Sequence, residues 1–210
     1  MNFINIHNMR KNFIAKNRNK DHVIVEGKNN ILLSAPHGVS QVRLGKAKFG
    51  EIGSIATALV LQEQTDSWLI AKTKNNNDDA NFDDESRYKN DIAQIILKNK
   101  IEYLIDIHGL AAKRNCDINL GTHLGRNIKN NEKVFNELYK ALVENGFETT
   151  IDQPFMAGVR TIAGSVSNKF PKLWTIQMEI NCSITNKKEN YARFKKLLKV
   201  LAEWIETLNN

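Results

Sequence analysis

The chain has 210 residues, of which 41% are hydrophobic and 25% charged, and these values are typical of a globular protein with one domain over 1–210. No apolar run is long enough to cross a bilayer, and the first 20 residues are polar and basic without the apolar core of a signal peptide, so we expect a cytoplasmic protein with no membrane partner. The formal net charge is +7, but the lysines are scattered and no nucleic-acid-binding motif accompanies them, so we also expect no nucleic-acid partner.

Apolar runs and helical periodicity predict strands alternating with helices along the chain. Strands are expected at 22–26, 30–35, 68–72, 101–107, 116–121, 149–151 and 173–180, and helices at 52–64, 88–97, 131–144 and 190–208. The polar stretch 74–85 reads as a surface loop. This alternation predicts an α/β fold with a mixed, mostly parallel sheet between two layers of helices, an α/β/α sandwich whose ligand lies at the carboxyl ends of the central strands.

Two of these apolar runs end at the same dipeptide, His-Gly. The first ends at His37 and Gly38, and the second ends at His108 and Gly109. We interpret each glycine as a sharp turn that leaves an imidazole at the rim of the sheet. Two histidines that converge on one site of a small α/β domain predict a divalent metal.

A zinc hydrolase needs three protein ligands with nitrogen or oxygen donors and an open position for water. His37 and His108 supply two, and Glu51, at the start of the helix that follows the first strand, is the expected third. Asp106 is an alternative ligand or a partner that orients an imidazole. His123, which also follows a strand, is a further alternative.

Three other polar residues are candidates for the chemistry. Glu179 interrupts an apolar strand, where a buried carboxylate is costly unless it is paired or used, so it is the candidate general base. Arg87 and Arg160 stand in expected loops, where a guanidinium can hold a substrate carboxylate or a developing oxyanion. Each of these arginines is also compatible with a surface ion pair.

Taken together, these segments resemble the N-formylglutamate amidohydrolase family, which is similar to zinc carboxypeptidases and to phage poly-γ-glutamate hydrolases. The resemblance covers about 30–181, and its motifs are Ser34 to Gly38, Gly50 to Ser54, Asp79 to Tyr88, Asp106 to Gly109, and Glu179 to Asn181. Three features depart from the family pattern. Val39 stands where relatives usually have a second small residue. Thirteen residues separate His37 from Glu51, and Asn81 and Arg87 stand apart where relatives have an adjacent Asn-Arg pair.

The resemblance implies a phosphorylase/hydrolase-like sandwich that binds one zinc ion through His37, Glu51 and His108. It implies that Glu179 acts as the base. It also implies that Asn81, Arg87 and Arg160 lie near the carboxylate of a small acidic substrate.

We therefore expect a zinc-dependent amidohydrolase that cleaves a small acidic N-acyl amino acid such as N-formylglutamate. Two alternatives stay open: a γ-glutamyl or peptide hydrolase of the carboxypeptidase type, and a non-catalytic metal- or ligand-binding protein on the same fold.

Overall fold

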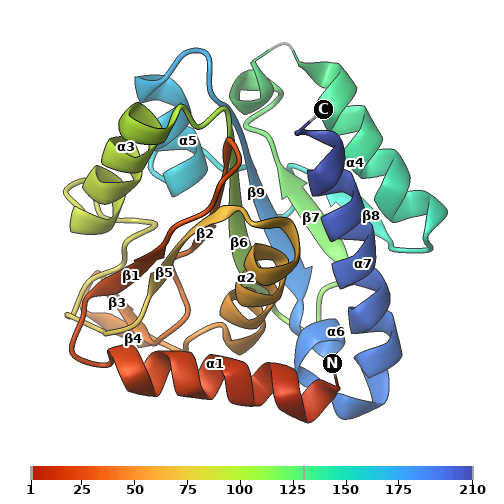
Figure 1. Ribbon diagram of the computed structural model, residues 1–210, viewed down its shortest axis with the longest axis horizontal. Helices are drawn as coiled ribbons and strands as arrows, with labels where there is room; N and C mark the ends of the chain where they lie inside the picture. The colour runs from red at the N-terminus through yellow and green to blue at the C-terminus, as the bar shows by residue number, and fades with distance from the viewer. Residues whose placement is uncertain (1, 130, 210) are drawn as a thin grey trace.

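The computed structural model describes residues 2–129 and 131–209, and a seven-stranded sheet forms its centre (Figure 1). The strand order is β1-β5-β2-β6-β9-β7-β8. Neighbouring strands are parallel except that β1 is antiparallel to β5 and β7 to β9. The strands are β1 (His22–Val25), β2 (Ile31–Ala35), β5 (Trp68–Lys72), β6 (Tyr103–Leu110), β7 (Ile118–Gly121), β8 (Thr149–Ile151) and β9 (Trp174–Asn181).

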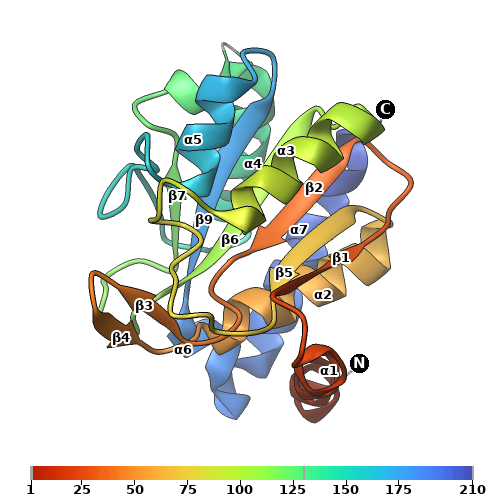
Figure 2. The same ribbon diagram turned by 90° about the vertical axis from the view of Figure 1, so that its left-hand side faces the viewer.

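Helices cover both faces of the sheet, as Figures 1 and 2 show from two sides. One hydrophobic core lies against α2, α4 and α7, and the other lies against α3 and α5. These helices are α2 (Ile52–Thr65), α3 (Arg87–Asn99), α4 (Glu132–Glu144), α5 (Ile162–Lys169) and α7 (Tyr191–Thr207). The predicted mixed-sheet sandwich is therefore confirmed.

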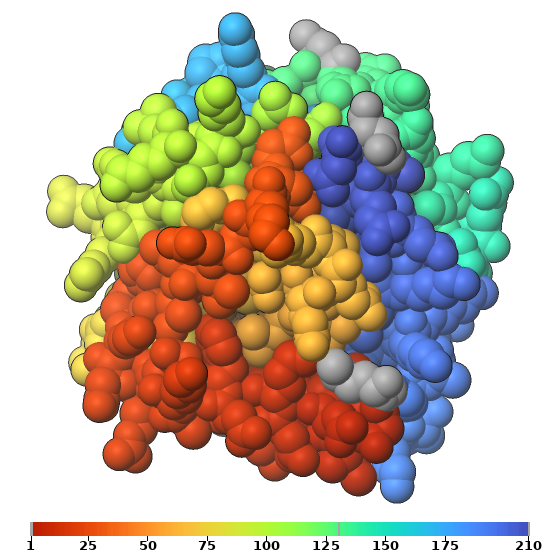
Figure 3. Space-filling view, in the orientation of Figure 1, coloured from red at the N-terminus to blue at the C-terminus, as the bar shows by residue number. Residues whose placement is uncertain are grey.

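Smaller elements complete the fold, and α1, α6 and the β3–β4 hairpin lie at the lower end of the molecule in Figure 1. Figure 3 shows α1 lying across the end of α2, with the segment that includes α6 beside it. They are α1 (Phe3–Asn17), the hairpin β3 (Gln41–Arg43) and β4 (Lys46–Lys48), α6 (Cys182–Asn186), and the 3-10 turns η1 (Arg126–Ile128) and η2 (Lys188–Asn190). No helix in the described part of the chain has both the length and the apolar character needed to span a bilayer.

The central strands are buried on both faces, and β2 is almost continuously apolar, whereas polar and apolar residues alternate along β9. All five residues of β2 and all eight of β9 are buried, because helices cover both sides of the sheet. Sequence analysis did not predict α1, α5, α6 or the β3–β4 hairpin. Only Ile6 and Asn17 of α1 are fully buried, so its sequence has little of the apolar periodicity that marks a helix.

The interpretation of the two His-Gly dipeptides needs correction. Strand β2 ends at Ala35, and β6 continues through His108 to Leu110, because β9 pairs with it along that whole length. Neither Gly38 nor Gly109 has a positive φ, so neither is there to reverse the chain. Both are instead sites of close approach: a Cβ on Gly38 would lie 2.9 Å from Ile55 Cδ1, and one on Gly109 would lie 3.1 Å from Glu51 Cβ.

The hydroxyl of Tyr88 links α3 to two neighbouring strands. It donates a hydrogen bond to the Ile70 carbonyl at 2.7 Å and accepts one from the Ala35 amide at 3.1 Å. It also lies 3.2 Å from Ser34 Oγ. Burial raises the pKa of Tyr88 well above its ordinary value, so the group stays neutral in this network.

We expect Tyr88→Phe to lower the free energy of unfolding by about 1–3 kcal/mol, because the buried Ala35 N–H and Ile70 carbonyl each lose a partner. Urea denaturation followed by circular dichroism measures this difference. Tyr139→Phe is the matched control, since the Tyr139 hydroxyl has no hydrogen bond within the described residues and Tyr139 is only partly buried. Equal midpoints for the two variants would show that the Tyr88 hydroxyl does not stabilise the fold.

Candidate metal centre

Three possible metal ligands come from three different elements and converge at the carboxyl edge of the sheet. His37 lies two residues beyond β2, His108 lies within β6, and Glu51 is the residue that caps the start of α2. His37 Nδ1 lies 2.8 Å from Glu51 Oε1 and 3.2 Å from His108 Nδ1, and His108 Nδ1 lies 3.5 Å from Glu51 Oε2. All three side chains are largely buried.

This cluster fits a zinc ion. Zinc binds imidazole nitrogen at about 2.0–2.1 Å with tetrahedral geometry, which places neighbouring ligand atoms about 3.3 Å apart. The three separations in the cluster bracket that value. Two imidazoles and one carboxylate are also a donor set found in catalytic zinc sites, where a fourth position stays open.

Each imidazole is held by a second carboxylate at its other nitrogen. His37 Nε2 lies 2.9 Å from Asp79 Oδ1, and His108 Nε2 lies 3.0 Å from Asp106 Oδ2. Asp79 and Asp106 are fully buried. A carboxylate that accepts a hydrogen bond from Nε2–H leaves the Nδ1 lone pair free to bind a metal, so these pairs fix the tautomer and the ring orientation.

The electrostatics of the cluster favour a bound cation. Burial tends to lower the pKa of His108, but Asp106 and Glu51 outweigh it and raise this pKa well above the ordinary value. The pKa of His37 is raised in the same way, because the effects of Glu51 and Asp79 exceed that of burial. Burial tends to raise the pKa of Glu51, but the two imidazoles lower it well below the usual range. The buried carboxylates therefore require positive charge close by, from protons or from a metal.

Glu179 lies beside this cluster on the next strand. Its Cα pairs with that of His108 across the β6–β9 ladder. Burial raises the pKa of Glu179 to about 7, although the charge of His108 opposes the shift. Gln177 Nε2 donates a hydrogen bond to Glu179 Oε1 at 3.0 Å and so holds the carboxyl group in place. A carboxyl group with such a pKa can both take and return a proton near neutral pH.

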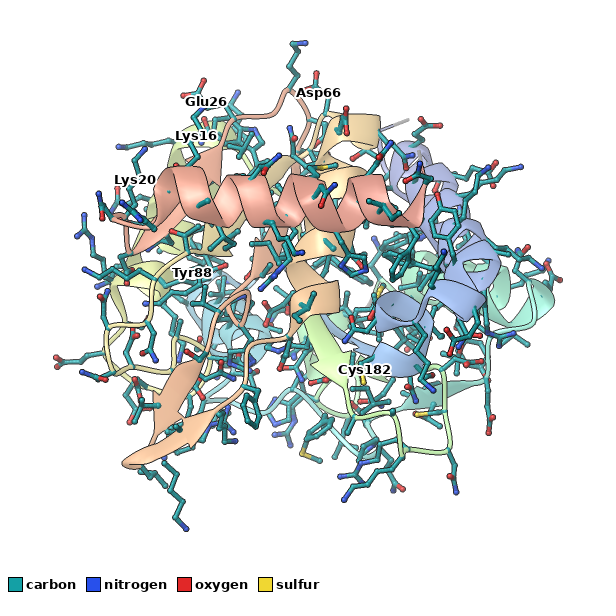
Figure 4. All side chains as sticks on the ribbon, turned by 90° about the horizontal axis from the view of Figure 1, so that it is seen from below. Lys16, Lys20, Glu26, Asp66, Tyr88 and Cys182 are labelled. Atoms are coloured by element: carbon teal, nitrogen blue, oxygen red, sulfur yellow. The ribbon has the colours of Figure 1, made fainter. Side chains whose placement is uncertain are left out.

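A cavity of about 630 Å³ opens over the cluster, and six of the seven candidate site residues line it. Figure 4 looks at the molecule from this edge, with Cys182, one of the residues that line the cavity, labelled. The six are His37, Glu51, Asn81, His108, Arg160 and Glu179. Asn81 Oδ1 accepts a hydrogen bond from Ile162 N at 2.7 Å and so joins the loop before α3 to the start of α5.

Arg87 is the candidate that the structure does not bring to the cavity. It begins α3, its side chain is 80% exposed, and its Nε lies 3.9 Å from Asp91 Oδ2 one helical turn later. The ion-pair interpretation therefore describes Arg87, and it also applies to Arg160, whose Nη2 lies 3.3 Å from Asp84 Oδ2 although Arg160 lines the cavity. Asp106 contacts His108 as an orienting partner, and His123 is not part of the three-residue cluster.

Sequence reasoning missed Asp79, Arg43 and Gln177. Arg43 Nε donates a hydrogen bond to Asp79 Oδ2 at 2.7 Å, so one buried carboxylate connects Arg43 to His37. Asp79 stands in the polar stretch 74–85, whose composition resembles any surface loop. Its proximity to Asn81 along the chain was the only sequence signal that Asp79 belongs to the site. No local feature of the sequence indicated a role for Arg43.

No family model matches the sequence, and no curated protein matches it. Solved structures do match. The chain is similar to gene product Atu2144 from Agrobacterium tumefaciens, with a TM-score of 0.66, 11% identity and coverage of 91% of this chain and 97% of that one. It is also similar to N-formylglutamate amidohydrolase from Ralstonia eutropha JMP134, with a TM-score of 0.57 and 12% identity. That match covers 89% of this chain and 98% of the other.

A third similar structure is a metallo-carboxypeptidase from Burkholderia cenocepacia, with a TM-score of 0.54, 9% identity and coverage of 96% of this chain and 69% of that one. At such low identities these matches establish a shared fold. The resemblance drawn from the sequence motifs is therefore confirmed at the level of the fold.

We expect the protein to bind one zinc ion, and we expect Glu51→Gln to weaken that binding by at least about 100-fold, because a neutral amide oxygen replaces a charged ligand. Asp106→Asn should weaken zinc binding about 10-fold, because the His108 ring loses the carboxylate that orients it. Competition with a chromophoric chelator measures both affinities. Glu63→Gln, on the exposed side of α2, is the control. Indistinguishable affinities for Glu51→Gln and Glu63→Gln would exclude Glu51 as a ligand.

Proposed function

We propose that this protein is a metal-dependent hydrolase that cleaves the C–N bond of a small acidic N-acyl amino acid such as N-formylglutamate. The observation that carries the proposal is the convergence of His37 Nδ1, His108 Nδ1 and the Glu51 carboxylate beside Glu179 in an open cavity. A structural metal site is normally closed by protein ligands on all sides, whereas three ligands beside a cavity leave room for substrate.

The cofactor that we propose is one zinc ion held by His37, Glu51 and His108. Zinc bound at such a site polarises a scissile carbonyl and lowers the pKa of water. Asp79 and Asp106 keep the two imidazoles in the tautomer and orientation that this binding needs.

Glu179 is the proposed general base. Gln177 donates a hydrogen bond to Glu179 Oε1, whereas Oε2 has no hydrogen-bond partner among the described residues. Oε2 is therefore free to accept a proton from the attacking water. The same group then donates the proton to the nitrogen of the leaving amine. Its raised pKa suits both steps, because neither protonation state is strongly favoured near neutral pH.

Two features support an acidic acyl amino acid as the substrate. Asn81 and Arg160 line the cavity, and an amide and a guanidinium can both bind a carboxylate, with Asp84 as the present partner of Arg160. One of the similar structures is an N-formylglutamate amidohydrolase. The second candidate function is peptide hydrolysis of the carboxypeptidase type, which the similarity to a metallo-carboxypeptidase and the size of the cavity favour. Both functions use the same residues.

We expect Glu179→Gln to bind zinc with unchanged stoichiometry while losing about 10²–10⁴-fold in turnover, because the amide cannot accept the proton. The assay measures release of amine from N-formyl-, N-acetyl- and γ-glutamyl-substituted amino acids and from short acidic peptides. Glu137→Gln, a half-exposed position on α4, is the control and should retain full activity.

Near-wild-type turnover by Glu179→Gln would overturn the proposed mechanism. A wild-type protein that binds zinc and hydrolyses no member of the panel would instead support a non-catalytic metal- or ligand-binding role on this fold.

A further inference from the structure

The thirteen residues between His37 and Glu51 include the β3–β4 hairpin, which lies at the same end of the molecule as α6 (Figure 2). The Glu51 amide donates a hydrogen bond to the His37 carbonyl at 2.7 Å, so the segment leaves and re-enters the fold at almost the same point. A second backbone hydrogen bond, from Val42 N to Asp78 O at 3.0 Å, joins the hairpin to the loop that carries Asp79. The hairpin is thus fixed at its base by backbone contacts.

One face of this hairpin turns toward the cavity. Gln41 and Arg43 alternate along β3 and share a face, and Lys48 is the cross-strand partner of Gln41. All three line the same cavity as His37, Glu51, His108 and Glu179. The hairpin therefore forms one wall of the candidate active site.

The polar groups on this wall have hydrogen-bonding capacity that the rest of the described chain does not use. Gln41 is only 6% exposed, yet its Oε1 is buried without a partner. Lys48 makes no ion pair with any described residue. Arg43 uses only its Nε, so its two terminal nitrogens remain available. A buried amide without a partner is costly, and a ligand that pairs with it recovers that cost.

The guanidinium of Arg43 is also held rigidly. Its Nε donates to the buried Asp79, and its Cζ lies 4.9 Å from the centre of the Phe82 ring. The guanidinium of Arg160 lies 5.3 Å from the centre of the same ring. Phe82 directly follows Asn81 in the loop that also carries Asp79. Two arginines from distant parts of the chain therefore gather around Phe82.

We propose that the hairpin wall formed by Gln41, Arg43 and Lys48 is the subsite that binds the side-chain carboxylate of the substrate. The proposal rests on the function proposed above and identifies the residues that select an acidic substrate. Arg43 presents a preorganised pair of donors that matches a carboxylate, Lys48 adds a point charge, and the Gln41 amide pairs with the neighbouring amide of the substrate.

The test compares a probe with a charged side chain and a probe with a neutral side chain in the zinc-loaded Glu179→Gln protein, which keeps the probes intact. N-acetyl-L-glutamate and N-acetyl-L-glutamine differ only in the side-chain carboxylate, and isothermal titration calorimetry gives the affinity for each. We expect Lys48→Met to weaken binding of N-acetyl-L-glutamate by about 10-fold and to leave N-acetyl-L-glutamine unchanged.

The matched control is Lys46→Met. Lys46 lies on the same strand and carries the same charge, but it is not among the residues that line the cavity. We expect its substitution to change neither affinity by more than about two-fold, because it alters only a screened surface charge. Equal effects of the two lysine substitutions would overturn the proposal, as would the absence of N-acetyl-L-glutamate binding at millimolar concentrations.

Arg43→Lys provides a second arm, because it keeps the positive charge and removes the forked donor pair. We expect at least a 10-fold loss for N-acetyl-L-glutamate and about the same zinc content as the parent protein. A purely structural role for Arg43, acting through Asp79 on His37, predicts instead that zinc content falls and that both probes weaken equally.

These outcomes separate the proposal from the function on which it rests. Hydrolysis at equal rates of substrates with neutral and with acidic side chains would contradict the carboxylate subsite. It would leave the proposed hydrolase function standing. Selective binding of N-acetyl-L-glutamate through Lys48 and Arg43, without hydrolysis of any substrate by the wild-type protein, would support the subsite and overturn the catalytic function.

Discussion

The pairing of each buried imidazole with a buried carboxylate is the interaction on which the candidate site depends. His37 and His108 lie in a region that also contains Glu51, Asp79 and Asp106, and none of these charges is well solvated. Such a group of carboxylates is stable only with compensating positive charge and with hydrogen bonds to most of its oxygens. The chain provides both, since Gly109 N donates to Glu51, Arg43 donates to Asp79, and Ser34 donates to Asp106.

The fold supplies these partners because the parallel strands end at one edge of the sheet. Ser34 and Asp106 pair across the β2–β6 ladder, and His108 and Glu179 pair across the β6–β9 ladder, so neighbouring strands fix the relative positions of the polar groups. The two glycines that follow the histidines also help to position these polar groups, because each allows a close approach of neighbouring elements. Gly109 leaves room for the Glu51 side chain to lie against β6, and Gly38 lets the chain pass close to α2 and β5.

The sequence was sufficient to predict the central strands, helices α2, α3, α4 and α7 and the residues of the cluster, because long apolar runs, helical periodicity and polar residues at strand ends leave a local signal. It did not identify the partners that come from distant parts of the chain. Arg87 was a candidate because it is close to Asn81 in sequence, whereas Arg43 reaches the same neighbourhood from 38 residues away. The hairpin strands have three residues each, too few to show an alternating pattern, and most of α1 is too polar to show a buried face.

The position of the hairpin has a further consequence for how such a site can change its selectivity. It begins after one ligand of the cluster and ends at another, and the hydrogen bond from Glu51 N to His37 O closes its base. Lengthening a closed loop costs little, about 0.6 kcal/mol for each doubling of its length, and the insertion does not interrupt the sheet. The ligands can therefore keep their geometry while the hairpin varies. The rigid sheet edge would determine the chemistry and the hairpin would determine which substrate reaches it, a division in which a stable scaffold positions variable loops.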